Sequence, residues 1–206
     1  MPTVTKPSNA KKTFAAIVAI ITWVTILVQF YLAAVSITNF FSYFTILCNL
    51  LIVICLSYTL LAPASGPGVF FSSVSVQTAI ALYIFIVGVI FNLVLRGLAD
   101  LSGMAWVIDN LLHVVCPILY LLYWVIFVPR GVLKWKDVIK WVYFPLAYVI
   151  YSLIRGPIVN WFPYPFLNTT KLGYEKVLLN VTVIMIVFLG AGLIMIAINR
   201  SLKKKR

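Results

Sequence analysis

The sequence predicts an all-α membrane protein, a bundle of six transmembrane helices. Hydrophobic residues make up 64% of its 206 residues, and only four side chains are acidic. A soluble domain of this size could not bury so much apolar surface. The apolar residues form six runs, most of them close to the roughly 20 residues that a helix needs to cross a hydrocarbon core of about 30 Å. We therefore expect a single six-span domain over residues 1–206.

Residues that favour turns separate these runs. Pro63 and Gly66 lie in one break, Gly97 and Gly103 bracket another, and Pro129 begins a third. The expected spans are 13–35, 40–61, 74–95, 106–128, 138–154 and 176–198.

The fifth run is the shortest of the six. Pro145 interrupts it and Gly156–Pro157 follows it, so we expect a kinked helix that ends early. The first run, of about 23 residues, is longer than the apolar core of a cleavable signal peptide. We therefore expect it to remain as a membrane anchor.

The basic residues indicate the orientation of the chain. The formal net charge is +12, from 16 Lys and Arg against four acids. These cations lie at the ends of apolar runs and not along one polar face, so we expect no nucleic-acid partner. Twelve of the 16 would share the side of the basic N-terminal segment 1–12 and the C-terminal tail 200–206. By the positive-inside rule both termini are then cytoplasmic.

The only histidine, His113, lies inside the fourth run. An ionisable side chain at membrane depth is costly and marks a functional site by default. Spans two and four would both run inward from the outer side. At 1.5 Å per residue, Thr45 would lie about 8 Å and His113 about 10 Å from the start of its span. A hydroxyl beside a neutral imidazole is the minimal apparatus for nucleophilic acyl transfer.

Further polar residues could assist this pair. Asp109 and Asn110 precede His113 by one helical turn, and either could fix the tautomer of the imidazole ring. Asn49 and Asn92 could donate hydrogen bonds to a developing oxyanion. Two arginines at the outer ends of spans three and five could bind a fatty acid carboxylate through their guanidinium groups. These arginines are Arg96 and Arg155.

Each of these residues also has a structural interpretation. The hydroxyl of Thr45 could bond the carbonyl of Phe41 within its own helix. His113 and the asparagines could serve only as hydrogen bonds between helices. The two arginines could reach the membrane surface or pair with Asp100 or Asp109. The alternative function is therefore a non-catalytic lipid-binding or transport bundle with a polar cavity around His113.

Two short motifs add a resemblance to a known family. The runs Tyr43–Leu47 and Asn110–Pro117 resemble those of the androgen-induced transmembrane hydrolase family. The resemblance implies an intramembrane threonine hydrolase of fatty acid esters of hydroxy fatty acids, with Thr45 as the nucleophile and His113 as its partner. The loop Trp161–Asn168 is similar to that of compact, bacterial relatives, and this resemblance implies a bacterial inner (cytoplasmic) membrane. The pair Leu111–Leu112 departs from the animal members, which carry more polar residues there.

The residue types present do not suggest a cofactor. The three cysteines lie within spans without a CxxC pairing, and one histidine with four acids cannot form a usual histidine-rich metal centre. We therefore expect no metal and no cofactor. The expected partners are membrane lipids and a lipid ester that enters from the bilayer, and the sequence leaves the oligomeric state open.

Overall fold

A computed structural model describes residues 8–201, and helices are the only regular secondary structure in that range. Lys6 and the four basic residues at 203–206 lie outside the described part. Six helices are long and apolar enough to cross a membrane, which confirms the all-α, multi-pass fold class. The orientation of the termini stays a prediction. The six spans are Asn9–Leu32, Phe44–Leu61, Val74–Leu95, Gly103–Phe127, Asp137–Val159 and Thr169–Ser201.

The chain divides into two compact units. Unit 1 contains the chain up to Leu32 together with Asn49–Val128, and unit 2 contains Ala33–Cys48 with the chain from Pro129 onward. The boundary between Cys48 and Asn49 falls inside one continuous helix, α3 (Phe44–Leu61). The expectation of a single domain stays a prediction.

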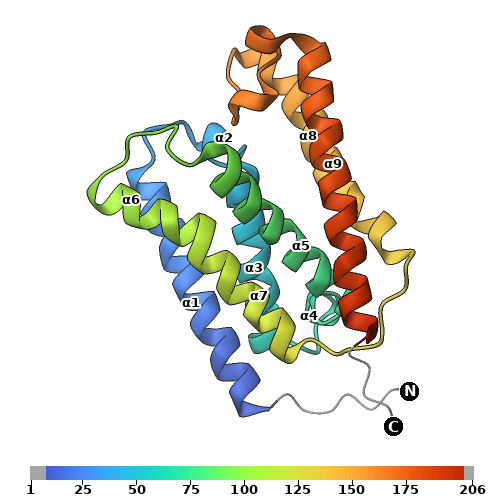
Figure 1. Cartoon of the computed structure of the whole chain (residues 1–206). Helices are drawn as coiled ribbons and strands as arrows, with labels where there is room; N and C mark the ends of the chain where they lie inside the picture. The colour runs from blue at the N-terminus through green and yellow to red at the C-terminus, as the bar shows by residue number, and fades with distance from the viewer. Residues whose placement is uncertain (1–7, 202–206) are drawn as a thin grey trace. The chain divides into compact units, whose positions relative to one another are not determined.

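Unit 1 is built around the third and fourth spans. The third consists of α5 (Val74–Ile90) and the π-helical turn η1 (Phe91–Leu95), and the fourth of α6 (Gly103–Asn110), the π-helical turn η2 (Leu111–Val115) and α7 (Cys116–Phe127). Helix α7 packs against α5 and against α1 (Asn9–Leu32), as Figure 1 shows. The short helix α4 (Gly66–Phe71) precedes α5.

Hydrogen bonds between buried side chains join the helices of unit 1. The indole Nε1 of Trp124 on α7 donates to Oγ1 of Thr78 on α5 over 2.9 Å, and both residues are buried. In lipid, apolar burial alone does not hold helices together, so close packing and such bonds contribute most to their association.

Unit 2 pairs the last two spans. Helix α8 (Asp137–Val159) packs against α9 (Thr169–Ser201), and the single turn η3 (Pro165–Leu167) lies between them in sequence and also contacts α9 (Figure 1). The one-turn helix α2 (Ile37–Phe40) and the first residues of α3 belong to the same unit.

A buried asparagine fixes the loop that leads into α8. Asn199, near the end of α9, is fully buried. Its Oδ1 accepts from the main-chain N–H groups of Val132 and Leu133, each over 3.3 Å, and its Nδ2 donates to the carbonyl of Pro129 over 2.9 Å. One side chain therefore satisfies three main-chain groups of the loop.

The ends of the first two spans differ from the sequence prediction because of serine caps. Helix α1 begins at Asn9, before the predicted start, because Oγ of Ser8 accepts from the N–H of Lys11 over 3.2 Å. The second span begins at Phe44 and not at residue 40, since α2 forms a separate turn capped by Ser36.

The prediction that Gly156–Pro157 ends the fifth span was wrong. Helix α8 continues through both prolines to Val159 and ends at Asn160, whose φ of 50° is left-handed. A proline this close to the end of a helix removes only one late hydrogen bond, which a membrane helix tolerates. Gly156 instead allows the ring of Phe162 to pack against the helix, because a Cβ at this position would collide with the ring.

The sixth span also begins earlier than predicted. Helix α9 starts at Thr169, and a kink at Gly173, whose φ is 76°, separates its first turn from the long segment that follows. Glycine adopts this combination of φ and ψ without strain because it has no Cβ, so the chain can kink at Gly173.

We expect Asn199→Ala to lower the free energy of unfolding by about 2–4 kcal/mol, because three main-chain groups lose their buried partner. Unfolding of the purified protein in detergent, followed by tryptophan fluorescence, measures the change. Ser201→Ala is the control, since this exposed hydroxyl bonds only the carbonyl of Ile198 in its own helix. Equal stability of the two variants would contradict the role of Asn199.

Candidate functional site

His113 belongs to one π-helical turn, and its ring packs against a residue of a second π-helical turn. His113 is the central residue of η2, and its ring stacks on Phe91, the first residue of η1, with centroids 3.9 Å apart and planes 8° from parallel. π-helical turns are rare, occur mostly as single bulges within α-helices, and are frequent at functional sites. Sequence patterns do not reveal them, and neither was predicted.

The π-helical turn at His113 changes the backbone bonding around it. The N–H of Cys116 donates to the carbonyl of Leu111, five residues back. The corresponding donor to the carbonyl of Leu112 would be the N–H of residue 117, but Pro117 has no N–H. That carbonyl instead accepts from Nδ2 of Asn49, on α3, over 3.3 Å. The wider turn therefore supplies the acceptor that joins α3 to the fourth span.

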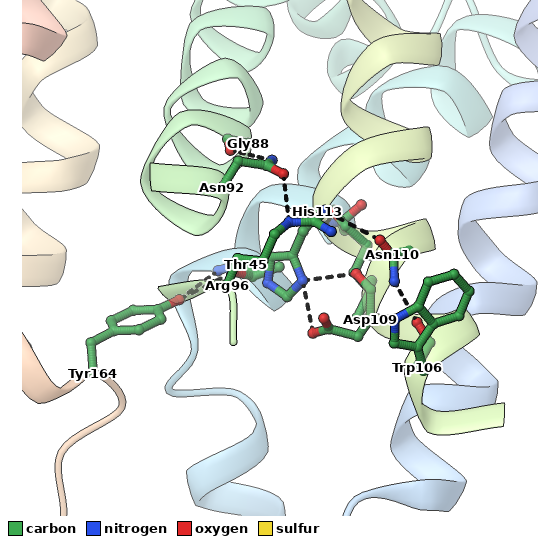
Figure 2. Close-up of polar contacts among 11 residues, drawn as sticks. Thr45, Gly88, Asn92, Arg96, Trp106, Asp109, Asn110, His113 and Tyr164 are labelled. Atoms are coloured by element: carbon green, nitrogen blue, oxygen red, sulfur yellow. Dashed lines mark hydrogen bonds and ion pairs between the residues drawn. The ribbon is translucent and has the colours of Figure 1, made fainter. Parts of the chain in front are cut away.

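Nδ1 of the His113 imidazole contacts Asp109 twice. Nδ1 lies 2.9 Å from the carbonyl oxygen of Asp109 and 3.1 Å from Oδ1 of the same residue (Figure 2). Both neighbours are acceptors, so Nδ1 carries the proton in the neutral ring, and the lone pair is on Nε2. The sequence left Asp109 and Asn110 as alternatives for this role, and the geometry assigns Asp109 to the ring.

Asn110 belongs instead to a group around Arg96. Arg96 donates from Nε to Oδ1 of Asn92 over 3.0 Å and from Nη2 to Oδ1 of Asn110 over 3.2 Å. The guanidinium lies over the ring of Phe91, 5.2 Å from its centroid. Phe91 therefore contacts both Arg96 and His113. Figure 2 shows Arg96 with Asn92 and Asn110.

The two asparagines predicted to bind an oxyanion already make bonds. Asn49 is fully buried and donates to Leu112. Asn92 donates from Nδ2 to the carbonyl of Gly88 over 2.7 Å, while its Oδ1 faces Arg96. The bond of Asn49 joins two helices, as the structural interpretation expects, whereas those of Asn92 stay within its own span and orient the arginine. The oxyanion role of both residues stays a prediction.

Thr45 lies in unit 2, in the first turn of α3, and is buried. Its main-chain N–H donates to the phenol oxygen of Tyr164 over 3.1 Å, and its Oγ1 lies 3.2 Å from the same oxygen (Figure 2). The amino end of a helix carries partial positive charge, which stabilises negative charge nearby. A developing alkoxide at Oγ1 would be in a favourable field.

Tyr164 was not among the predicted site residues. It lies in the loop between α8 and α9, between Pro163 and Pro165, and the resemblance of this loop was the only signal that pointed to it. Burial raises the pKa of Tyr164 to about 12, so the phenol keeps its proton near neutral pH. The ring stacks on Phe166 at 5.2 Å between centroids.

Arg155 lies in unit 2 and contacts the segment before α3. Its Nη2 donates to Oδ1 of Asn39 over 2.6 Å, and its guanidinium lies 5.5 Å from the ring centroid of Trp161. These contacts tie α8 to α2 and to the loop that follows α8. They give Arg155 a structural task in addition to the predicted carboxylate binding, which stays a prediction.

The predicted residues thus form two groups. His113, Asp109, Arg96 and the three asparagines belong to unit 1, and Thr45 and Arg155 belong to unit 2. The pairing of Thr45 with His113 stays a prediction. Within residues 8–201 no group of three His, Cys, Asp or Glu side chains is arranged to hold a metal ion.

Comparisons of the chain with family models, with curated proteins and with solved structures find no match.

We expect the neutral ring of His113 to carry its proton on Nδ1. The chain has a single histidine, so 15N labelling of histidine gives one pair of ring signals in an NMR spectrum of the detergent-solubilised protein. Asp109→Ala should move the tautomer balance toward Nε2–H, because one acceptor at Nδ1 is lost, and Asn110→Ala should leave it unchanged. A wild-type ring protonated on Nε2 would contradict the assignment.

Proposed function

We propose that this protein is an intramembrane lipid esterase in which Thr45 is the nucleophile and His113 the general base. The proposed substrates are fatty acid esters of hydroxy fatty acids or similar lipid esters, and we propose that the chain is a compact member of the androgen-induced transmembrane hydrolase family. The observation that carries the proposal is the contact of Nδ1 of His113 with the carboxylate and carbonyl of Asp109.

This contact prepares the histidine for proton transfer. A general base needs an oriented ring with a lone pair directed at the nucleophile. Hydrogen bonding at Nδ1 leaves the lone pair on Nε2, and the carboxylate of Asp109 would stabilise the imidazolium that forms. A histidine that served only to join helices would not require a carboxylate on its own helix.

The bonding of α3 supports the pairing of Thr45 with His113. Asn49 follows Thr45 by one helical turn in the continuous helix α3. Asn49 also donates to the carbonyl of Leu112, the residue before His113. The helix that carries the proposed nucleophile is therefore hydrogen-bonded, through Asn49, to the helix that carries the proposed base.

The proposed reaction has two steps. Oγ1 of Thr45 attacks the ester carbonyl while Nε2 of His113 takes its proton, and the imidazolium then protonates the departing alcohol. In the second step His113 takes a proton from water, which attacks the acyl-threonine. The proton returns to Oγ1 as the fatty acid leaves, so the enzyme is regenerated and one water is consumed per ester.

We also propose that the chain has cytoplasmic termini and lies in a bacterial inner membrane, and that the ester enters from the outer leaflet. The distribution of Lys and Arg in the sequence supports the orientation, and the resemblance of the loop Trp161–Asn168 supports the bacterial membrane. Arg96, on the same unit as His113, is the proposed site for the free carboxylate of the substrate. Its bonds to Asn92 and Asn110 orient the guanidinium and leave further donors for a carboxylate.

We expect Thr45→Ala to abolish ester hydrolysis and His113→Ala to lower kcat by about 10²–10⁴-fold, because nucleophile and base are removed. The assay uses purified protein and the palmitoyl ester of a hydroxystearic acid, together with labelling by a fluorophosphonate probe. Mass spectrometry should find the probe on Thr45. Thr59→Ala, which removes a second hydroxyl from the same helix, should retain wild-type activity.

Two results would reject the esterase. One is full activity of Thr45→Ala, and the other is a folded wild-type protein that neither hydrolyses an ester nor reacts with the probe. If that inactive protein still binds the ester with an affinity that depends on His113, the non-catalytic lipid-binding alternative is correct.

We expect Arg96→Ala to raise KM about 10- to 100-fold for the ester with a free carboxylate, because a charged hydrogen-bonded contact worth about 1.5–3 kcal/mol is lost. The methyl ester of the same substrate should show little change. Arg96→Lys tests the geometry, since a lysine keeps the charge without the planar fork. An equal effect of Arg96→Ala on both substrates would show that the residue only supports the helix.

A further inference from the structure

We infer that Tyr164 is a catalytic residue that donates a hydrogen bond to the ester oxygen while Thr45 attacks the carbonyl carbon. The inference rests on the proposed function and adds the oxyanion donor of the reaction. It concerns unit 2 alone, because both residues belong to that unit.

The position of the hydroxyl fits this role. The phenol oxygen lies 3.2 Å from Oγ1 of Thr45 and accepts the main-chain N–H of the same residue over 3.1 Å (Figure 2). In the tetrahedral intermediate the oxyanion is bonded to the carbon that Oγ1 has just joined. A donor close to Oγ1 can therefore reach the oxyanion, at the 2.7–3.1 Å or so that such donors need.

The proton of the phenol is available for donation. A phenol has one O–H to donate and lone pairs to accept with. The N–H of Thr45 occupies an acceptor position of the phenol oxygen, so the O–H itself is left to donate. Before the substrate binds, Oγ1 of Thr45 is a suitable acceptor for this O–H. During the reaction the oxyanion would become the acceptor in place of Oγ1.

Packing of the aromatic loop holds the hydroxyl in place. Pro163 and Pro165 restrict the backbone on both sides of Tyr164. The ring stacks on Phe166 with planes 2° from parallel, and it makes a T-shaped contact with Tyr43, 5.9 Å between centroids. A donor fixed during folding needs no reorganisation when negative charge develops, which is the basis of oxyanion stabilisation.

Other phenols near the start of α3 have different partners. Tyr148 donates from its hydroxyl to the carbonyl of Ser42 over 3.0 Å, and the hydroxyl of Tyr151 lies 2.8 Å from Oγ of Ser42. Tyr164 is the phenol that bonds both the N–H and the hydroxyl of Thr45. Tyr151 thus provides a matched control, because it is a tyrosine of the same unit whose hydroxyl contacts another side-chain hydroxyl, that of Ser42.

The test compares wild type, Tyr164→Phe and Tyr151→Phe in hydrolysis of the palmitoyl ester of a hydroxystearic acid. Tyr164→Phe should lower kcat by about 10²–10³-fold with little change in KM, as for loss of one oxyanion donor. Binding of a trifluoromethyl ketone, which forms a tetrahedral adduct, should weaken by a similar factor. Tyr151→Phe should behave like wild type in both measurements.

Each outcome is decisive. If kcat and ketone binding of Tyr164→Phe stay within about threefold of wild type, while Thr45→Ala is inactive, this inference is wrong and the esterase stands. An inactive wild-type protein would overturn both. Should Tyr164→Phe not fold, 3-fluorotyrosine at position 164 replaces it, because the ring shape is kept and the O–H becomes a stronger donor. An altered kcat then supports the inference, and an unchanged kcat rejects it.

Discussion

The π-helical turn at His113 is the constraint on which the cluster of unit 1 depends. Inside an apolar span every carbonyl needs a donor, because no water can replace a lost bond. The N–H of Cys116 serves Leu111, and Pro117 offers no N–H, so the carbonyl of Leu112 takes its bond from Asn49. In the same turn the ring of His113 stacks on Phe91, and its Nδ1 contacts Asp109. Backbone bonding, helix association and the orientation of the imidazole thus have one cause.

In unit 2, too, a side chain pairs with a main-chain group that lacks a partner within its own helix, here at the start of α3. The first N–H groups of a helix have no carbonyl within the helix. At Thr45 a phenol from the loop after α8 accepts this N–H, so the loop and the helix fix each other. Fixed aromatic contacts of Tyr164 then determine what lies beside the hydroxyl of Thr45. The phenol that caps the helix is therefore also the group that we propose as the oxyanion donor.

Much of this architecture could be predicted from the sequence, and the errors have identifiable causes. Long apolar runs gave all six spans, because a bilayer requires about 20 apolar residues per crossing. The ends of spans were less accurate, since Ser8 and Ser36 cap helices through single hydrogen bonds. The prolines of α8 suggested an early end, but Gly156 proved to be a packing position beneath Phe162. His113 and Asp109 were found because ionisable residues in a span are rare and their spacing of four is local.

What the sequence by itself determined is the membrane class, the six crossings, and the residues of one helix that can meet at a spacing of three or four. These follow from hydropathy and helical periodicity, which are local properties. Only the tertiary structure decided between Asp109 and Asn110 as partner of His113, assigned Asn110 and Asn92 to Arg96, and brought Tyr164 to Thr45. Those contacts depend on a π-helical turn or join residues far apart in the chain, and neither leaves a periodic signal in the sequence.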